Sequence, residues 1–387
     1  MKSSNINLGI FAFCLAIVLF FFDCASDTLA PPLADSINLR WVPAYEAESR
    51  DQVELGLMWS LSFLGADLPK GSLNRAIRYL DNDRFELSLD GLGFKMQALK
   101  ALSVIIERLK NSEEYQMNQS IDLGRFLVLS LHSSWHYYEI IGVPKTLSAF
   151  IESKSFFEYA EFAVTESTVS NVNRILRLKV DEDIQKMAFI GIETRDAPDS
   201  IDYEIDHYET IDVMPNGQLR FAIYDQSGDL MAASPSELSN AGKPSKCMWC
   251  HESHIQPLFV FTPDIEGFIS REAFLEQVEM ANQHIADYRN NLNSDLDFSD
   301  QQSHTESELL YISFMEPSGY RTANEWRLPQ ESVTNILQPF DTHLYQEFPF
   351  LGQLYFRNLV DSLAPYQILE VPGSVREMTN MEPNFFD

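Results

Sequence analysis

The sequence is poor in cysteine and in basic residues. Only four of its 387 residues are cysteines, and 28 lysines and arginines stand against 57 aspartates and glutamates, for a formal net charge of −29. A surface this acidic repels phosphate groups, so nucleic acids and anionic lipid headgroups are not expected partners. The charge fits a highly soluble surface, or a docking face for a basic partner protein.

The motifs of several common enzyme classes are also missing. We find no glycine-rich phosphate-binding loop, no nucleophile motif and no paired-carboxylate pattern in the sequence. Apolar and aromatic residues are plentiful instead, at 45% and 12%. This composition predicts a globular protein with a large core and not a disordered chain.

The N-terminus carries an apolar run of fifteen residues, Leu8 to Phe22, behind Lys2. A helix that spans a membrane needs about 20 apolar residues, so this run is short for one. A positive charge, a short apolar run and small residues after it predict a secretory signal over residues 1–26. An uncleaved N-terminal anchor is the second interpretation.

Cys24 follows the apolar run directly, in the segment LFFFDCAS. This segment resembles a bacterial lipoprotein signal, in which the cysteine becomes the lipidated first residue. Asp23 departs from the small residue that is usual there, and cleavage after Ser26 is the alternative. Residues 27–50 then read as an exposed tether. We expect an exported protein, periplasmic or on the cell surface, that is anchored to the membrane by its N-terminus.

The hydrophobic pattern changes twice along the chain. Residues 51–155 read as helical, because apolar residues recur at spacings of three and four. Residues 156–240 hold short segments rich in β-branched and aromatic residues, with Asn216-Gly217 as a tight turn, and predict an antiparallel sheet. Helical spacing returns in residues 241–387. Because helices and strands are segregated along the chain, we predict an α+β fold.

Cys247, Cys250 and His251 lie together in the segment KCMWCHESHIQP. Structural zinc needs four ligands, and the only other cysteines, Cys14 and Cys24, lie in or beside the signal. A thioredoxin-like pair should open a helix after a strand of a βαβ unit, whereas this pair follows a linker after a hairpin. The C-x-x-C-H spacing is that of covalent haem attachment. Two intervening residues let both sulfurs reach one porphyrin edge and carry the histidine under the iron.

On these residues the segment resembles the c-type cytochromes, over about a dozen residues and not over the whole chain. The resemblance implies one covalent haem c, attached through Cys247 and Cys250, with His251 as the proximal iron ligand. The region 241–387 would then be the haem-bearing one. A disulfide or thiol site and a zinc site are the alternatives.

The sixth iron ligand is predicted from position along the chain. His254 lies one helical turn after His251 and would stay on the proximal side of the haem. Met315 ends a helical segment ahead of Pro317, and methionine opposite histidine is the common electron-transfer arrangement. We therefore predict Met315 as the distal ligand. The alternatives are Met280 or His284, His136, and an open position.

We expect an exported haem c protein that transfers single electrons through one haem. Its redox partner is unidentified, and the acidic surface favours a basic one. Two other classes of function stay open. One is a haem enzyme or a gas or redox sensor with an open distal site. The other is a surface interaction protein whose cysteine pair is a structural disulfide.

Overall fold

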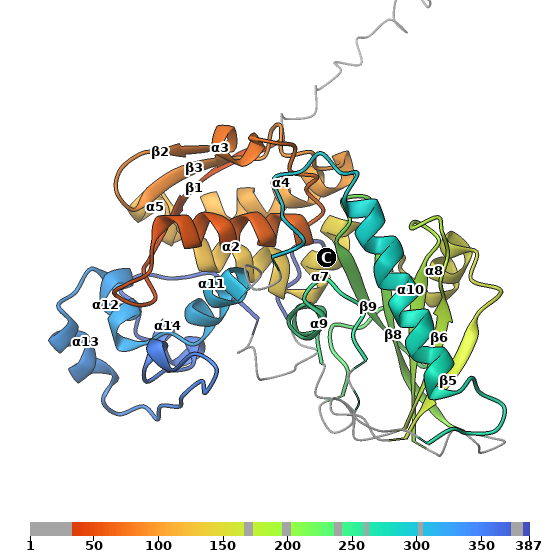
Figure 1. Cartoon of the computed structure of the whole chain (residues 1–387). Coiled ribbons are helices and arrows are strands. Elements are labelled where there is room, and N and C mark those ends of the chain that lie inside the picture. The colour runs from red at the N-terminus through yellow and green to blue at the C-terminus, as the bar shows by residue number, and fades with distance from the viewer. Residues whose placement is uncertain are drawn as a thin grey trace, which may run out of the picture. The chain divides into compact units, whose positions relative to one another are not determined.

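The computed structural model describes residues 33–387, apart from 166–172, 196–202, 236–241, 258, 260–262, 301–304 and 373–381. The predicted secretory signal, Cys24 and the first residues of the predicted tether lie outside the described residues. From Ala34 onward, helices and two sheets pack together as one unit (Figure 1). Within the described part of the chain, no helix has both the length and the apolar character that crossing a membrane requires.

The larger sheet has five antiparallel strands in sequence order: β5 (Ala160–Val164), β6 (Asn173–Lys179), β7 (Ala188–Thr194), β8 (Ile205–Val213) and β9 (Leu219–Asp225). Every residue of β7 is buried, so both faces of the sheet are covered at this strand. Asn216-Gly217 makes the predicted turn between β8 and β9, with Gly217 at a φ of 82°, which favours glycine. The antiparallel sheet predicted for the centre of the chain is confirmed.

A smaller mixed sheet lies among the N-terminal helices. Its strand order is β2 (Ile77–Tyr79), β3 (Arg84–Ser88), β1 (Ser36–Arg40) and β4 (Ile121–Asp122), with β1 antiparallel to β3 and parallel to β4. The sequence did not indicate this sheet. β1 lies in the stretch expected to be a tether, and β2 to β4 lie in the region expected to be helical. Strands this short carry too few residues for a period-two pattern to stand out.

Helices make up most of the regular secondary structure of the N-terminal and C-terminal regions, as predicted. The N-terminal set comprises α2 (Arg50–Phe63), α3 (Ser72–Ala76), α4 (Met96–Lys110), α5 (Glu113–Asn118), α6 (Leu123–Leu127), the π-helix η1 (Val128–His132), α7 (Ser134–Ile141) and α8 (Leu147–Lys154). The C-terminal set comprises α9 (Pro244–His251), α10 (Arg271–Arg289), α11 (Thr305–Met315), α12 (Gly319–Trp326), α13 (Gln330–Leu337), the 3-10 helix η3 (Pro349–Leu351) and α14 (Arg357–Asp361). Together with the two sheets they make the predicted α+β fold.

α11 joins the C-terminal region to the N-terminal helices. All its residues from Ser307 to Met315 are buried, because α11 packs against α2 and α6. Gly56 of α2 and Gly124 of α6 permit the close approach, since a Cβ atom at either position would lie only 2.6 Å or 2.4 Å from an atom of α11. The two predicted helical regions therefore share one core instead of folding as separate domains.

Residues 382–387, here called the C-terminal segment, are docked beside α7 (Figure 1). Glu382 forms a buried ion pair with Lys243, which directly precedes α9, and accepts a hydrogen bond of 2.8 Å from a backbone N–H at the start of α7. The backbone N–H of Phe385 donates to Nε2 of His136 at 3.0 Å, and the two rings have centroids 4.5 Å apart. The C-terminal segment thus links α7 to the start of α9.

Candidate cofactor site

The two cysteines and the adjacent histidine lie on the short helix α9. Pro244 occupies its first helical position, where a backbone N–H has no partner within the helix and none is needed. Because residues three and four apart share one side of a helix, α9 turns Cys247, Cys250 and His251 toward the same side. The structure therefore brings together the three residues on which the predicted haem attachment depends.

Both cysteines are unpaired thiols, Cys247 half-buried and Cys250 exposed. Burial raises the pKa of each thiol above its usual value. Within the described part of the chain, no group of three potential metal ligands includes either cysteine. These observations disfavour zinc as the interpretation of the motif.

His251 is held as a neutral imidazole. Burial lowers its pKa to about 4, and the neutral form is the one that ligates a metal. Its Nδ1 lies 3.2 Å from the backbone oxygen of His254, to which it can only donate, and 3.5 Å from the backbone nitrogen of Gln256. The shorter contact assigns the hydrogen to Nδ1 and fixes the orientation of the ring. Nε2 is then the nitrogen with a lone pair for iron. The carbonyl acceptor belongs to His254, which follows α9 closely.

Cys247 and His251 line a cavity of about 100 Å³. It lies between the larger sheet on one side and α9, α10 and the loop between them on the other. Cofactor sites are mostly apolar and measure about 300–1,000 Å³, so this cavity is smaller than they are. The apolar lining consists of Val164, Leu176, Leu178, Phe189, Ile211 and Phe221 on the sheet side and Ile255, Phe259, Phe274 and Val278 opposite. The lining is apolar and holds a neutral imidazole, as a haem site requires, but the cavity is too small for a porphyrin in this conformation.

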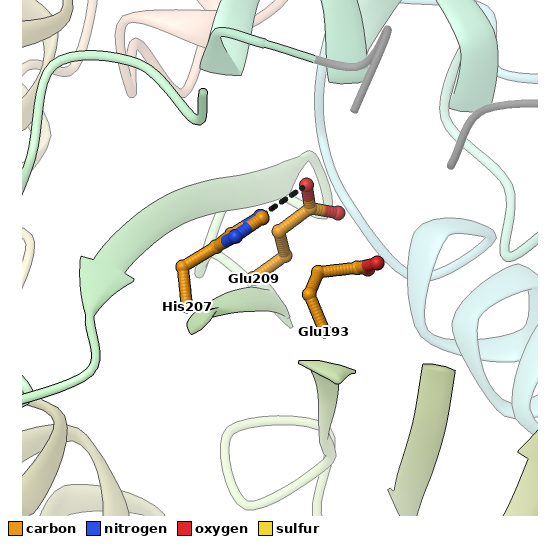
Figure 2. A group of neighbouring side chains, drawn as sticks. All are labelled: Glu193, His207 and Glu209. Atoms are coloured by element: carbon orange, nitrogen blue, oxygen red, sulfur yellow. Dashed lines mark hydrogen bonds and ion pairs between the residues drawn. The ribbon is translucent and has the colours of Figure 1, made fainter. Parts of the chain in front are cut away.

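One charged cluster interrupts the apolar face of the sheet. It consists of Arg174 on β6, Glu193 on β7, and His207 and Glu209 on β8, and Figure 2 shows the last three. The guanidinium of Arg174 contacts the carboxylate of Glu193 through Nε, and its Nη2 lies 3.1 Å from Oε2 of Glu209. Nε2 of His207 lies 3.4 Å from the other oxygen of Glu209. We call these four residues the Arg174 cluster.

Three members of the Arg174 cluster have potential ligand atoms within 4.8 Å of one another: Glu193, His207 and Glu209. The guanidinium of Arg174 already supplies the positive charge that a metal ion would bring. Burial opposes the charge of Glu209, yet Arg174 and His207 hold its pKa below the usual range. Burial likewise opposes the charge of His207, but its carboxylate neighbours raise its pKa. We interpret the cluster as a closed ion network and not as a metal centre.

Met315, the predicted distal ligand, is fully buried in another part of the core. It belongs to a cluster of apolar residues from α11 and the C-terminal region, among them Ile312, Tyr345 and Leu354. Met315 is not among the residues that line the cavity beside His251. Trp249, which lies between the two cysteines, packs against this same apolar cluster. Met315 as a ligand stays a prediction from sequence.

The alternative distal ligands are also placed elsewhere. Both ring nitrogens of His136 lie within hydrogen-bond distance of backbone groups, at 2.5 Å and 3.0 Å. Met280 is 40% exposed on α10, and Nδ1 of His284 lies 3.2 Å from a backbone oxygen. Among the described residues that line the cavity, His251 is the only histidine, and there is no methionine.

Neither a protein-family model nor a curated protein nor a solved structure matches the chain. The interpretation of the site therefore rests on the three residues of α9 and on the cavity that two of them line. These two features are independent, because the motif is a local pattern whereas the cavity wall is built mostly from the sheet and α10.

Proposed function

We propose that the chain carries one covalently bound haem c and serves in single-electron transfer. Cys247 and Cys250 would hold the haem through thioether bonds, and His251 would ligate its iron through Nε2. The observation that supports the proposal is that Cys247 and His251 of the C-x-x-C-H motif line the same mostly apolar cavity. Once bound, the iron supplies one-electron chemistry by changing between its ferrous and ferric states.

The residues of the site have separate roles in this proposal. Each thiol adds across one vinyl group, its sulfur going to one carbon and its hydrogen to the other, so that no group leaves. His251 donates its Nδ1 hydrogen to the carbonyl of His254, which increases the basicity of Nε2. The apolar walls exclude water, and a low-dielectric site disfavours the extra positive charge of ferric iron. We therefore expect the cavity to raise the reduction potential.

We further propose that the protein is exported and held at the membrane as a lipoprotein through Cys24. Covalent haem attachment takes place outside the bacterial cytoplasm, which agrees with the N-terminal apolar run, and two or more acyl chains anchor a protein stably. With a net charge of −29, the protein should attract a basic redox partner. Electron transfer to such a partner should slow as ionic strength rises, because salt screens the attraction.

Covalent haem is tested by expressing the full chain with a periplasmic haem c maturation system and staining denaturing gels for haem peroxidase activity. The wild-type band should survive boiling, whereas Cys250→Ser should weaken or abolish it. Cys24→Ser is the matched control, because it removes a cysteine outside the motif. It should keep the haem stain and move from the membrane to the soluble fraction. Wild-type protein that has the mass of the chain without haem and a Cys247–Cys250 disulfide would refute the proposal. It would favour the alternative in which the cysteine pair is a structural disulfide.

A haem enzyme or sensor with an open iron site is the second candidate function. The observation that favours it is the cavity lining, which within the described residues offers His251 but no second imidazole and no methionine. The optical spectrum separates the two functions. A low-spin spectrum that carbon monoxide does not change supports electron transfer, whereas a high-spin ferric spectrum with carbon monoxide binding to the ferrous form supports the open site.

A further inference from the structure

A second cavity lies along α7, outside the site described above. Its volume is about 480 Å³, within the range of about 300–1,000 Å³ that small-molecule sites occupy. Its walls come from α7, from the turn that follows β9, and from the C-terminal segment, whose end lies beside α7 in Figure 1. The described residues that line it are all different from those that line the cavity beside His251, so the two cavities are separate.

Hydrogen bonds hold the walls of this second cavity in place. The hydroxyl of Tyr138 on α7 accepts from the backbone N–H of Ile223 on β9 at 3.2 Å and donates to the backbone oxygen of Met231 at 3.0 Å. In the turn after β9, the backbone N–H of Asp225 donates to the backbone oxygen of Asp229 at 2.8 Å. The contacts of the C-terminal segment with α7 hold the third wall. The cavity is therefore ordered before a ligand arrives.

Three aromatic side chains line the second cavity: Trp135 and Tyr138 from α7 and Phe386 from the C-terminal segment. The rings of Trp135 and Tyr138 have centroids 6.1 Å apart and planes at 78°, so they form two walls of a corner instead of stacking on each other. The Tyr138 hydroxyl already makes two hydrogen bonds, which leaves the ring as the part of this side chain that meets a ligand. The faces of aromatic rings are electron-rich and attract cations.

The charged residues of the lining favour a cation as well. Three are acidic, Glu139, Asp229 and Asp387, and one is basic, Lys145. In the part of the chain that the structure describes, none of the three carboxylates pairs with a lysine or an arginine. Asp229 and Asp387 are exposed and Glu139 is half-buried, so the carboxylates lie toward the mouth of the cavity while the rings lie deeper. This arrangement repels anions and attracts cations.

A quaternary ammonium group suits these walls better than a primary one. Its charge is spread over methyl groups, which pack on ring faces, and it has no N–H groups that would need acceptors deep in the cavity. It is also less strongly hydrated than a primary ammonium, so it loses less on leaving water. The carboxylates at the mouth attract it without a direct hydrogen bond.

We propose that the second cavity binds a small quaternary ammonium ion, which lies against the rings of Trp135 and Tyr138 and is attracted by Glu139 and Asp229. This site goes beyond the proposed haem function and does not depend on it, because no described residue of α9 lines the second cavity. The protein would then carry a ligand site for an organic cation in addition to the cysteine motif.

The test is a calorimetric titration of the full chain with three probes of the same shape. Choline carries the quaternary ammonium group, 3,3-dimethyl-1-butanol has a carbon in place of the nitrogen, and 3,3-dimethylbutanoate carries a negative charge. Wild-type protein should bind choline. The neutral alcohol should bind at least about 10-fold more weakly, because it loses both the cation–π contact and the ionic attraction, and the anion should not bind.

Variants of Trp135 separate the aromatic ring from the packing around it. Trp135→Phe keeps a ring with a weaker cation–π contact, and Trp135→Leu keeps only apolar volume. The Kd for choline should therefore rise in the order wild type, Trp135→Phe, Trp135→Leu, by about 5- to 30-fold over the series. The Kd for the neutral alcohol should change far less. A purely structural role of Trp135 would instead weaken both probes together.

Removing carboxylates tests the ionic attraction without changing the core. The double variant Glu139→Gln with Asp229→Asn should raise the Kd for choline about 3- to 20-fold, reduce its dependence on salt, and leave the Kd for the neutral alcohol unchanged. Glu182→Gln with Glu276→Gln is the matched control, because it removes the same charge from exposed positions outside the cavity. It should leave the Kd for choline unchanged.

Three results would overturn the proposed cation site. The first is folded wild-type protein that does not bind choline. The second is equal affinity for choline and the neutral alcohol, which would make the cavity a merely apolar groove. The third is a folded Trp135→Leu variant with unchanged affinity for choline. The haem stain and this titration succeed or fail independently, so a failure of the proposed function and a failure of the cation site are distinguishable.

Discussion

Replacing Glu382 by glutamine should destabilise the protein strongly. Glu382 and Lys243 form an ion pair whose side chains are 0% and 1% exposed. The glutamine amide keeps an oxygen for the backbone N–H at the start of α7, so the change is confined to the charge. Lys243 is then an ammonium group enclosed in the core without its partner.

The magnitude follows from the burial of Lys243. Burial lowers the pKa of this lysine from 10.5 to about 7, whereas contact with the Glu382 carboxylate favours the charged ammonium in the wild type. Without that carboxylate, a pKa of about 7 corresponds to a loss of about 4 kcal/mol of unfolding free energy near pH 7, within the loss of about 3–5 kcal/mol typical for a broken buried pair. Above pH 7 the folded variant releases the proton, while the unfolded chain keeps it until about pH 10.5. The loss should therefore shrink as the pH rises.

Urea unfolding at about pH 7 and about pH 9.5, followed by tryptophan fluorescence, measures this loss. The double variant Lys243→Met with Glu382→Gln should recover most of it, because neither charge remains. Asp183→Asn, which breaks an exposed pair with Lys186, is the control and should leave the unfolding curve unchanged. A loss below about 1 kcal/mol near pH 7, or an equal loss at both pH values, would contradict the buried pair and the docking of the C-terminal segment.

Acid should destabilise the protein through His136, because burial lowers its pKa to about 4 and only the unfolded chain takes up the proton between pH 6.5 and 4. His136 should account for about 3 kcal/mol of the unfolding free energy that is lost on acidification. In the variant His136→Gln, this part of the pH dependence should be absent. Gly124→Ala should lower the urea midpoint by overpacking against Phe314, at about 1–3 kcal/mol, whereas Gly319→Ala, with open space around it, should not. Met315→Ala should leave the haem spectrum unchanged, since Met315 does not line the cavity; a change to high-spin iron would establish it as the distal ligand.

The cysteine motif and the larger sheet were readable from the sequence because both depend on neighbours along the chain. Cys247, Cys250 and His251 come to one side of α9 through helical geometry alone. The strands of the larger sheet pair in sequence order, so short β-rich segments and the turn at Asn216-Gly217 were sufficient to predict it. Covalent haem itself remains a prediction.

The cavity wall and the position of Met315 could not be read in the same way. Arg174, Glu193 and His207 face one another only in the final register of three strands, and a single charged residue in a strand reads as a solvent-facing position. One pattern in the sequence could have indicated the cluster: several charged residues alternate with apolar ones on neighbouring strands. Met315 lies where the packing of α11 against α2 and α6 places it, and that packing depends on two distant glycines.

The larger sheet has a consequence for the order in which the chain assembles. Its strands pair only with their neighbours in sequence, and α9 and α10 follow directly, so both walls of the cavity come from the single stretch 160–289. Contacts between residues close in sequence form fast. The Glu382–Lys243 pair joins residues far apart, and it must wait until the later segment has emerged. We therefore expect an interval in which the cavity wall has formed while the start of α9 is not yet held by Glu382. If the chain is exported and carries haem as proposed, both thiols are accessible to a maturation enzyme during this interval.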